Sequence, residues 1–199
     1  METGWDPKRN QEDRPITEGK KNLLLTGRPG VGKTTLVRRV LDQLKGTITV
    51  GGFWTEEVRG SQGRIGFRIV TTEGQKGWLA KKGVASPQRV GSYGVYLESI
   101  ETIIIPSLKR AMENAQLIII DEIGKMELSH PSFSFWVWRC LQSLVPVLGV
   151  LQQSPLSFLD RIKRRSDVAL IVVTEQNRDA LVPYIVALIE QRVGGMCSS

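Results

Sequence analysis

The chain has 199 residues, of which 41% are hydrophobic and 24% charged, and its formal net charge is +7. This length and composition predict a single globular domain with a sizeable core. No apolar run reaches 18 residues, the first 15 residues are charged without an apolar stretch, and two cysteines do not make a disulfide framework. We therefore expect a soluble cytoplasmic protein, with neither a membrane span nor a signal peptide.

The positive charge has two interpretations. It could attract nucleic acid or free nucleotides through its field. It could also reflect solvated lysines and arginines spread over the surface. The basic clusters at residues 20–21 and 161–165 are too short to predict nucleic-acid binding. A nucleic-acid partner is therefore not favoured.

The first part of the chain changes from a polar segment to apolar patterns. Residues 1–21 are polar and mixed in charge, which predicts a disordered tail. We expect a strand at residues 22–26, then a glycine-rich loop, then an amphipathic helix at 35–44 with apolar residues three and four apart. Short strands separated by glycine turns predict an antiparallel insertion at 47–82.

The remaining elements alternate between helices and strands. Residues 83–97 predict a loop ending in a short strand, and 98–115 predict a helix kinked at Pro106. This alternation predicts a doubly wound α/β domain over residues 22–193, with a short tail at 194–199. The other expected strands lie at 117–120, 145–151 and 168–174, and the other expected helices at 130–144, 156–165 and 177–193.

Residues 23–35, LLLTGRPGVGKTT, contain the pattern Gly-x-x-x-x-Gly-Lys-Thr of a phosphate-binding loop, or Walker A motif. Its glycines let backbone N–H groups turn toward phosphate oxygens, and the following helix directs its positive end at the same anion. Lys33 would act on the β- and γ-phosphates, and Thr34 would bind Mg²⁺. The predicted nucleotide-binding residues are Gly27, Arg28, Pro29, Gly30, Val31, Gly32, Lys33, Thr34 and Thr35.

A second motif, LIIIDEIGKMEL, occupies residues 117–128. Its apolar run predicts a strand buried on both faces, and Asp121 closes that strand as in a Walker B motif. Asp121 would hold Mg²⁺ through water opposite Thr34, and Glu122 would be the general base for an attacking water. A strand-end aspartate alone often caps a helix, so the prediction depends on the phosphate loop. Lys125 could reach the phosphates or lie in solvent.

Recognition of the base is weakly signalled. A guanine-specific site would carry Asn/Thr-Lys-x-Asp on a late strand end, whereas residues 173–179 read VTEQNRD. Trp54, Tyr93 or Arg178 could stack on a base, although each residue type more often serves packing or the surface. Weak base reading predicts the use of several nucleoside triphosphates.

Charge that develops at the transition state needs a further cation, which an arginine of the same chain could supply. One candidate lies in the phosphate loop and the others lie elsewhere in the sequence. Each of them alone more often belongs to the surface. The candidates are Arg28, Arg59, Arg64, Arg68, Arg164 and Arg165.

Several stretches together resemble the thermophile-type nucleoside-triphosphatase family. In chain order they are GRPGVGKTTLV, GGFWTEEVR with RIGFRIVT, VGSYGV, IDEIGKMEL and VTEQNRD, within about residues 22–190. The stretches IDEIGKMEL and FWTEEVR are the specific ones, because the phosphate loop occurs in many families. Two departures are the 21-residue extension and residues 148–165, which replace a segment that typically begins with a Thr-Ile-Pro-like strand end.

The resemblance implies a RecA-like α/β fold in which the catalytic glutamate, here Glu122, follows the Walker B aspartate. It also implies slow Mg²⁺-dependent hydrolysis of ATP, GTP, CTP, UTP and TTP to the diphosphate and phosphate. The family's two nucleotide-binding stretches match residues 27–34 and a second set. This second set is Leu117, Ile118, Ile119, Ile120, Asp121, Glu122, Ile123 and Gly124.

Two other functions stay open at this point. A nucleotide or small-molecule kinase also needs a phosphate loop, and the insertion at 47–82 could hold its acceptor. A nucleic-acid-associated ATPase would use the positive charge. The residue set Lys33, Thr34, Asp121 and Glu122 favours hydrolysis of nucleoside triphosphates, and we expect a monomer.

Overall fold

The computed structural model describes residues 17, 19–61 and 63–196, and within them the strands form one nine-stranded sheet. Its order is β5-β6-β4-β3-β2-β7-β8-β1-β9. The strands are β1 (Asn22–Thr26), β2 (Val50–Gly60), β3 (Gly63–Thr71), β4 (Lys76–Lys82), β5 (Arg89–Val90), β6 (Tyr93–Val95), β7 (Leu117–Ile123), β8 (Val147–Leu151) and β9 (Val168–Val172).

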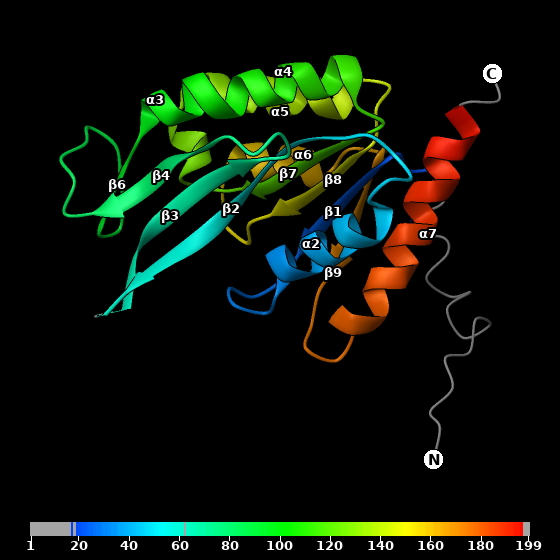
Figure 1. The fold of residues 1–199 in the computed structure, drawn as a ribbon, viewed down its shortest axis with the longest axis horizontal. Coiled ribbons are helices and arrows are strands. Elements are labelled where there is room, and N and C mark those ends of the chain that lie inside the picture. The colour runs from blue at the N-terminus through cyan, green and yellow to red at the C-terminus, as the bar shows by residue number, and fades with distance from the viewer. Residues whose placement is uncertain (1–16, 18, 62, 197–199) are drawn as a thin grey trace.

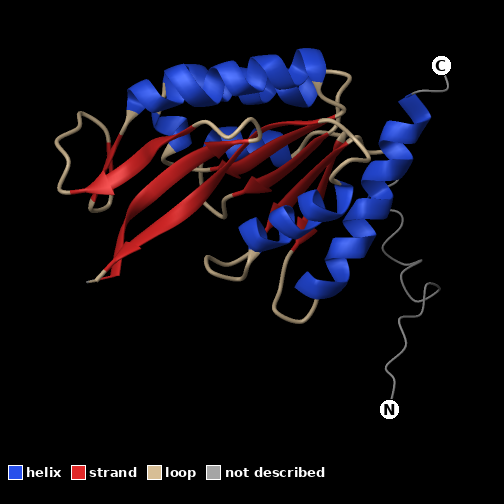
Figure 2. Cartoon of the chain, in the orientation of Figure 1, coloured by secondary structure: helices blue, strands red, loops and turns tan. Residues whose placement is uncertain are grey.

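Helices cover the two faces of the sheet unequally (Figures 1 and 2). On one face lie α2 (Lys33–Leu44) and α7 (Arg178–Met196). The other face carries α3 (Leu97–Ser99), the π-helical η2 (Ile100–Ile104), α4 (Ile105–Asn114), the 3₁₀ helix η3 (Glu127–Ser129), α5 (Pro131–Gln142) and α6 (Ser157–Lys163). This α/β layering, with a parallel core and an antiparallel extension, confirms the predicted fold class.

Strand β1 shows why the centre of the sheet is stable. All five of its residues are buried. Leu24 belongs to the core cluster under α4 and α5, while Leu23 and Leu25 belong to the cluster under α2 and α7. Because successive side chains of a strand point to opposite faces, a continuous apolar run fills both cores.

The antiparallel part begins later than the sequence predicts. Val50–Trp54 of β2 pairs in parallel with β7, so this half of β2 belongs to the core. The rest of β2 joins β3, β4, β6 and β5 in an antiparallel extension, here called the wing, and the β2–β3 end of the wing projects beyond the helices in Figure 1. No residue of β3, β4 or β6 belongs to the core cluster that includes α2 and α7. The predicted insertion at 47–82 therefore spans two environments.

The predicted helix at 98–115 is divided into α3, η2 and α4. Pro106 lies in the first turn of α4, directly after the π-helical residues 100–104. Because proline has no backbone N–H, it cannot donate to the preceding turn. The irregularity expected at Pro106 therefore takes the form of a wider turn before it.

Both ends of the described chain differ from the predicted tails. Residues 1–16 and 18 lie outside the described residues, but Thr17 is buried and its hydroxyl lies 3.1 Å from the hydroxyl of Tyr184. Arg192 donates to the carbonyl oxygens of Thr17 and Lys20, each at 2.9 Å. Helix α7 continues to Met196, beyond the predicted boundary at 193, and 197–199 lie outside the described part.

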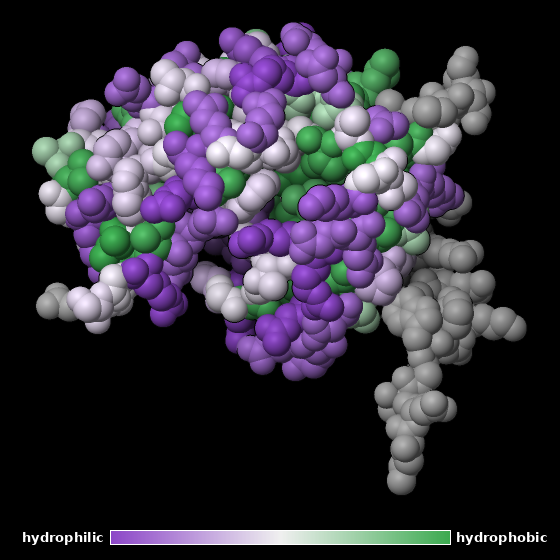
Figure 3. Space-filling view, in the orientation of Figure 1, coloured by the Kyte–Doolittle hydropathy of each residue, from purple (hydrophilic) through white to green (hydrophobic). Residues whose placement is uncertain are grey.

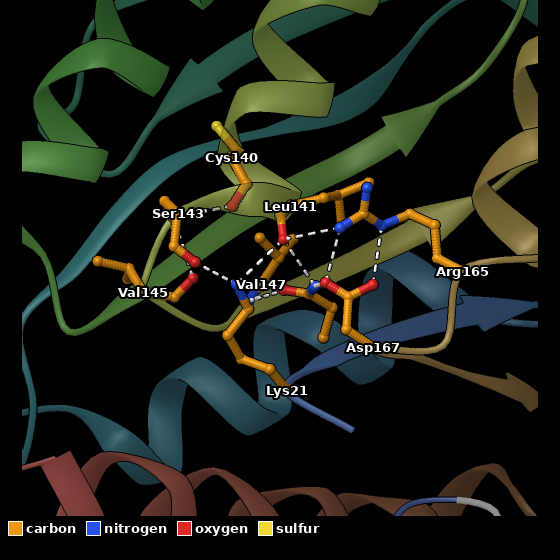
Figure 4. A network of polar contacts seen from close by, with 9 residues as sticks. Lys21, Cys140, Leu141, Ser143, Val145, Val147, Arg165 and Asp167 are labelled. Atoms are coloured by element: carbon orange, nitrogen blue, oxygen red, sulfur yellow. Dashed lines mark hydrogen bonds and ion pairs between the residues drawn. The ribbon is translucent and has the colours of Figure 1, made fainter. Parts of the chain in front are cut away.

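A polar network fixes the amino ends of the core strands (Figure 4). Lys21 and Asn22 both donate to the carbonyl oxygen of Leu141 near the end of α5, each at 3.0 Å. Asn22 also donates to Asp167, which Arg165 holds from the side at 2.8 Å. These contacts join the starts of β1 and β9 to the end of α5. They lie at the amino ends of these strands, whereas the phosphate loop follows the carboxyl end of β1.

In the described ranges, no helix has both the length and the apolar character needed to cross a bilayer.

The close approach of β2 to β7 gives a test of the fold. Gly52 has a φ of +112°, and a Cβ added there would lie 2.1 Å from the carbonyl oxygen of Ile119. Gly74 has a φ of +86° with open space around it. We expect Gly74→Ala to lower the free energy of unfolding by about 1–2 kcal/mol, the cost of a positive φ. Gly52→Ala should cost about 3 kcal/mol or more, because overpacking adds to that strain. Equal costs in urea unfolding at 25 °C would show that the two strands separate easily.

Candidate active site

The glycines of the phosphate loop are required by its backbone. Gly27 follows β1 with a φ of +153°, and a Cβ there would lie 2.5 Å from the carbonyl oxygen of Val173. Gly32 has a φ of +103° at the start of α2 and accepts a hydrogen bond from the N–H of Leu36 at 2.9 Å. The predicted residues 27–35 thus form the loop and the first turn of α2. The helix presents its free N–H groups there.

Lys33 lies over the loop that it would serve. Its ammonium group donates to the carbonyl oxygens of Gly27 at 2.9 Å and Arg28 at 3.0 Å. Both acceptors belong to the loop, so the charge is already held at the predicted phosphate position. A phosphate oxygen offers the ammonium a charged acceptor, which forms a stronger hydrogen bond than a carbonyl.

The second predicted stretch forms β7 and the residue after it. Asp121 is 0% exposed, and neither of its carboxylate oxygens has a hydrogen-bond partner among the described residues. Burial raises the pKa of Asp121 to about 7, and Glu122 adds to this, although the nearby Thr34 hydroxyl and Lys33 ammonium favour the charged form. The effects of Thr34 and Lys33 on Asp121 show that the structure brings the two motifs together.

Glu122 lies beside Asp121 at the carboxyl end of β7. The pairing of β7 with β8 shifts between Ile120 and Ile123 in this region. Burial raises the pKa of Glu122, while the Lys33 ammonium and a polar contact from Gln152 favour its charged form. Lys33 therefore influences both carboxylates, as expected if the two motifs form one site.

Gln152 is a site residue that the sequence reasoning did not identify. It follows β8, the strand between β1 and β7, and its amide oxygen accepts a hydrogen bond from the N–H of Lys125 at 3.1 Å. Its backbone N–H donates to Ile123 at 3.2 Å. A polar residue at the end of an apolar strand was the available signal, but its neighbour Gln153 gives the same signal and is exposed. The Lys125 side chain is exposed as well.

A third carboxyl group, that of Glu127, lies near the carboxyl groups of Asp121 and Glu122. Glu127 is only 4% exposed, and burial together with the charges of Glu122 and Asp121 raises its pKa to about 8. One of its carboxyl oxygens lies 3.1 Å from the position that a Cβ on Gly124 would take. Glu127 belongs to the specific motif IDEIGKMEL, although its role was not predicted. With this pKa the carboxyl group of Glu127 is mostly protonated at pH 7.

The candidate arginines lie at different places. Arg59 and Arg64 form ion pairs with Glu57 on the wing, at 2.6 and 2.5 Å. Arg68 stacks over Trp78, also on the wing, with 5.5 Å to the ring centroid. Arg165 belongs to the polar network at the amino ends of β1 and β9, and Arg164 precedes it directly. The structure thus separates Arg164 and Arg165 from the phosphate loop, while Arg28 lies within the loop.

The residues predicted to hold Mg²⁺ fit such an ion. Mg²⁺ prefers oxygen ligands, and it is usually held by one or two carboxylates together with waters and phosphate oxygens. The buried oxygens of Asp121 lack hydrogen-bond partners in the described chain, and Thr34 presents a hydroxyl toward the same place. A cation would satisfy these otherwise unpaired acceptors.

A glycine-rich loop at a helix start, next to an acidic pair at the end of a buried strand, defines a phosphate-loop NTPase. A model of the family described as NTPase matches residues 22–186, and the chain belongs to this family. It is 42% identical over 168 residues to the nucleoside-triphosphatase THEP1 of Thermotoga maritima, covering 84% of this chain and 95% of that protein.

Two solved structures are similar to this chain. The crystal structure of THEP1 from Aquifex aeolicus has a TM-score of 0.78 at 40% identity, over 85% of this chain and 99% of that one. The solution structure of a human cancer-related nucleoside triphosphatase has a TM-score of 0.73 at 39% identity, over 86% and 98% of the two chains. The family resemblance inferred from the motifs is confirmed.

The buried acid Glu127 predicts a pH-dependent stability. Between its ordinary pKa of 4.5 and about 8, the folded protein keeps a proton that the unfolded chain releases. Stability therefore falls as the pH rises through this window, by at most about 1.4 kcal/mol per pH unit. Glu127→Gln removes this loss, so its stability relative to the wild type should rise by about 2 kcal/mol between pH 5.5 and 7.5.

Urea unfolding of both proteins in buffer without divalent cations measures this difference. The exposed Glu113→Gln on α4 is the matched control and should show no such trend. A constant difference between Glu127→Gln and the wild type at both pH values would mean that Glu127 is ionised in the folded protein.

Proposed function

We propose that this NTPase hydrolyses ATP, GTP, CTP, UTP and TTP to the diphosphate and phosphate, with Mg²⁺ and with low base specificity. The observation that carries the proposal is the Asp121–Glu122 pair, in which Asp121 is buried and Glu122 half-buried, and Lys33 of the phosphate loop favours the charged form of both. The names of the relatives as nucleoside-triphosphatases support the same reaction.

Binding places the negative charge of the triphosphate at the loop. The backbone N–H groups between Gly27 and Thr34 receive the phosphate oxygens, and Lys33 exchanges its two carbonyl acceptors for the β- and γ-phosphates. Thr34 and Asp121 would hold Mg²⁺, which neutralises charge on the β- and γ-phosphate oxygens. Asp121 is buried and Lys33 is half-buried, so charges beside Asp121 interact more strongly than they would in water.

Glu122 then serves as the general base. It accepts a proton from a water molecule as the water oxygen attacks the γ-phosphorus and the bond to the bridging β–γ oxygen breaks. Burial raises the pKa of Glu122 and so makes it a stronger base. Gln152, held by Lys125 and Ile123, contacts Glu122 and fixes its orientation.

A kinase reaction is the second candidate. The wing has no helix of the α2–α7 layer over β3, β4 or β6, and this face could receive an acceptor. Incubation with γ-labelled ATP and a panel of nucleosides and nucleotides separates the two reactions. Label on an acceptor would favour the kinase, whereas label only in free phosphate would favour hydrolysis. Addition of RNA to the same assay tests the third alternative, and an unchanged rate would exclude a nucleic-acid-stimulated ATPase.

Glu122→Gln tests the proposed base. The variant keeps the shape of the side chain but cannot accept the proton, so the rate of phosphate release should fall at least about 100-fold. ADP binding should be retained, because Glu122 does not hold the phosphates. The exposed Glu190→Gln on α7 is the control. Full phosphate release by Glu122→Gln would rule out this mechanism, and Lys33→Ala should lose both binding and turnover.

Gln152 offers a finer test with a matched neighbour. Gln152→Leu removes the contact that orients Glu122, so kcat should fall about tenfold, the value of roughly one lost hydrogen bond to a charged group. KM and the affinity for ADP should stay nearly unchanged, because Gln152 contacts the base and not the phosphate loop. The adjacent exposed Gln153→Leu should behave as the wild type. A rise in KM at constant kcat in Gln152→Leu would assign the residue to substrate binding instead.

A further inference from the structure

The order of the strands determines how a nucleotide can lie on the phosphate loop. Asp121 ends β7, and β8 separates β7 from β1. On the other side of β1 lies β9, which leads into α7. If the terminal phosphate is directed at Asp121 and Glu122, as proposed above, the nucleoside must extend in the opposite direction. That direction leads to the start of α7.

A cavity lies at this place. Its volume is about 240 Å³, and it lies between the first turns of α2 and α7. Pockets for complete drug-sized ligands usually measure about 300–1,000 Å³, so this one suits part of a nucleotide. The surface over α2 and the start of α7 is predominantly hydrophilic in Figure 3. The cavity is lined by Gly32, Thr35, Leu36, Arg39, Arg178 and Asp179.

Arg178 brings a planar guanidinium group to this cavity. One of its guanidinium nitrogens donates to the carbonyl oxygen of Val31 in the phosphate loop at 3.3 Å. The side chain lies beside Gly32, where a Cβ would be in van der Waals contact with two of its atoms at 3.7 Å. The guanidinium is thereby held beside the loop, while the side chain remains 45% exposed. An arginine in this state can stack on an aromatic ring without losing its anchor.

We propose that the cavity between α2 and α7 is the nucleobase subsite and that Arg178 stacks its guanidinium on the base. The inference rests on the proposed function, because it requires a nucleotide on the phosphate loop. The ion pair between Arg39 and Asp179 joins α2 to α7 at the same cavity. Stacking on the face of a ring accepts every base, so this subsite gives low base specificity.

The two other residues that could stack on a base lie elsewhere. Trp54 is paired with Asp121 across β2 and β7, on the side of the terminal phosphate, and its ring N–H donates to Glu56 at 3.3 Å. Tyr93 lies on β6 and packs edge to face against Phe67, with ring centroids 5.3 Å apart. Neither residue lines the cavity beside the phosphate loop, whereas Arg178 does.

Equilibrium binding tests the subsite without requiring turnover. Titration calorimetry with Mg²⁺ compares ADP, GDP, CDP and UDP with pyrophosphate, which has no base. Arg178→Ala should weaken all four diphosphates by about tenfold, within the roughly 5- to 150-fold range for one lost base-stacking contact. Its affinity for pyrophosphate should equal that of the wild type. Arg178→Lys keeps the positive charge but lacks the planar guanidinium, so its affinity for the four diphosphates should fall nearly as much.

The control is Arg161→Ala, which removes an arginine stacked on Trp138 at 4.8 Å, outside the cavity. Unchanged ADP affinity in Arg178→Ala would overturn the subsite and leave the proposed function standing. An equal loss for ADP and pyrophosphate would show that Arg178 only supports the loop, and full rescue by lysine would replace stacking with charge. If the wild type binds none of the five compounds, both the proposed function and this subsite fail.

Discussion

The burial of Asp121 is the constraint on which the site depends. A carboxylate that is removed from water without a hydrogen-bond partner is destabilising, and the structure tolerates it only because the rest of the strand is firmly held. Leu117–Ile120 anchors the strand, because all four residues are at most 1% exposed and pack into the cores on both faces of the sheet. The apolar run thus places a charged group where a cation can satisfy it.

Strand β8 couples this carboxylate to the phosphate loop. It runs between β1 and β7, and Gly149 makes the fit possible, because a Cβ there would lie 2.9 Å from Leu24 and 3.1 Å from the carbonyl oxygen of Ile120. A strand this closely fitted fixes the spacing between the two motifs. Its last residue is followed by Gln152, which contacts Glu122. One strand therefore sets the separation of the motifs and orients the proposed base.

The two motifs could be predicted because each is local: spacing along the chain determines the loop, and an apolar run followed by acids determines the strand end. The order of the strands is not local. Without it, Trp54 and Arg178 were equivalent candidates, Gln152 could not be distinguished from Gln153, and the insertion at 47–82 could not be divided into core and wing. The π-helical residues before Pro106 were missed for a related reason, since proline predicts a disturbance but packing selects its form.

In the proposed reaction, the cluster of carboxyl groups would also link binding to catalysis. Burial raises the pKa of Asp121, Glu122 and Glu127, neighbouring carboxylates add to this at Asp121 and Glu127, and Lys33 opposes it at Asp121 and Glu122. A bound triphosphate brings several negative charges to Lys33, and the ammonium then pairs with phosphate as well as with the carboxylates. Negative charge near a carboxylate favours its protonated form. In the proposed reaction, Mg²⁺ at Asp121 and Thr34 would offset part of this negative charge, so the triphosphate and the ion together would set how readily Glu122 accepts a proton.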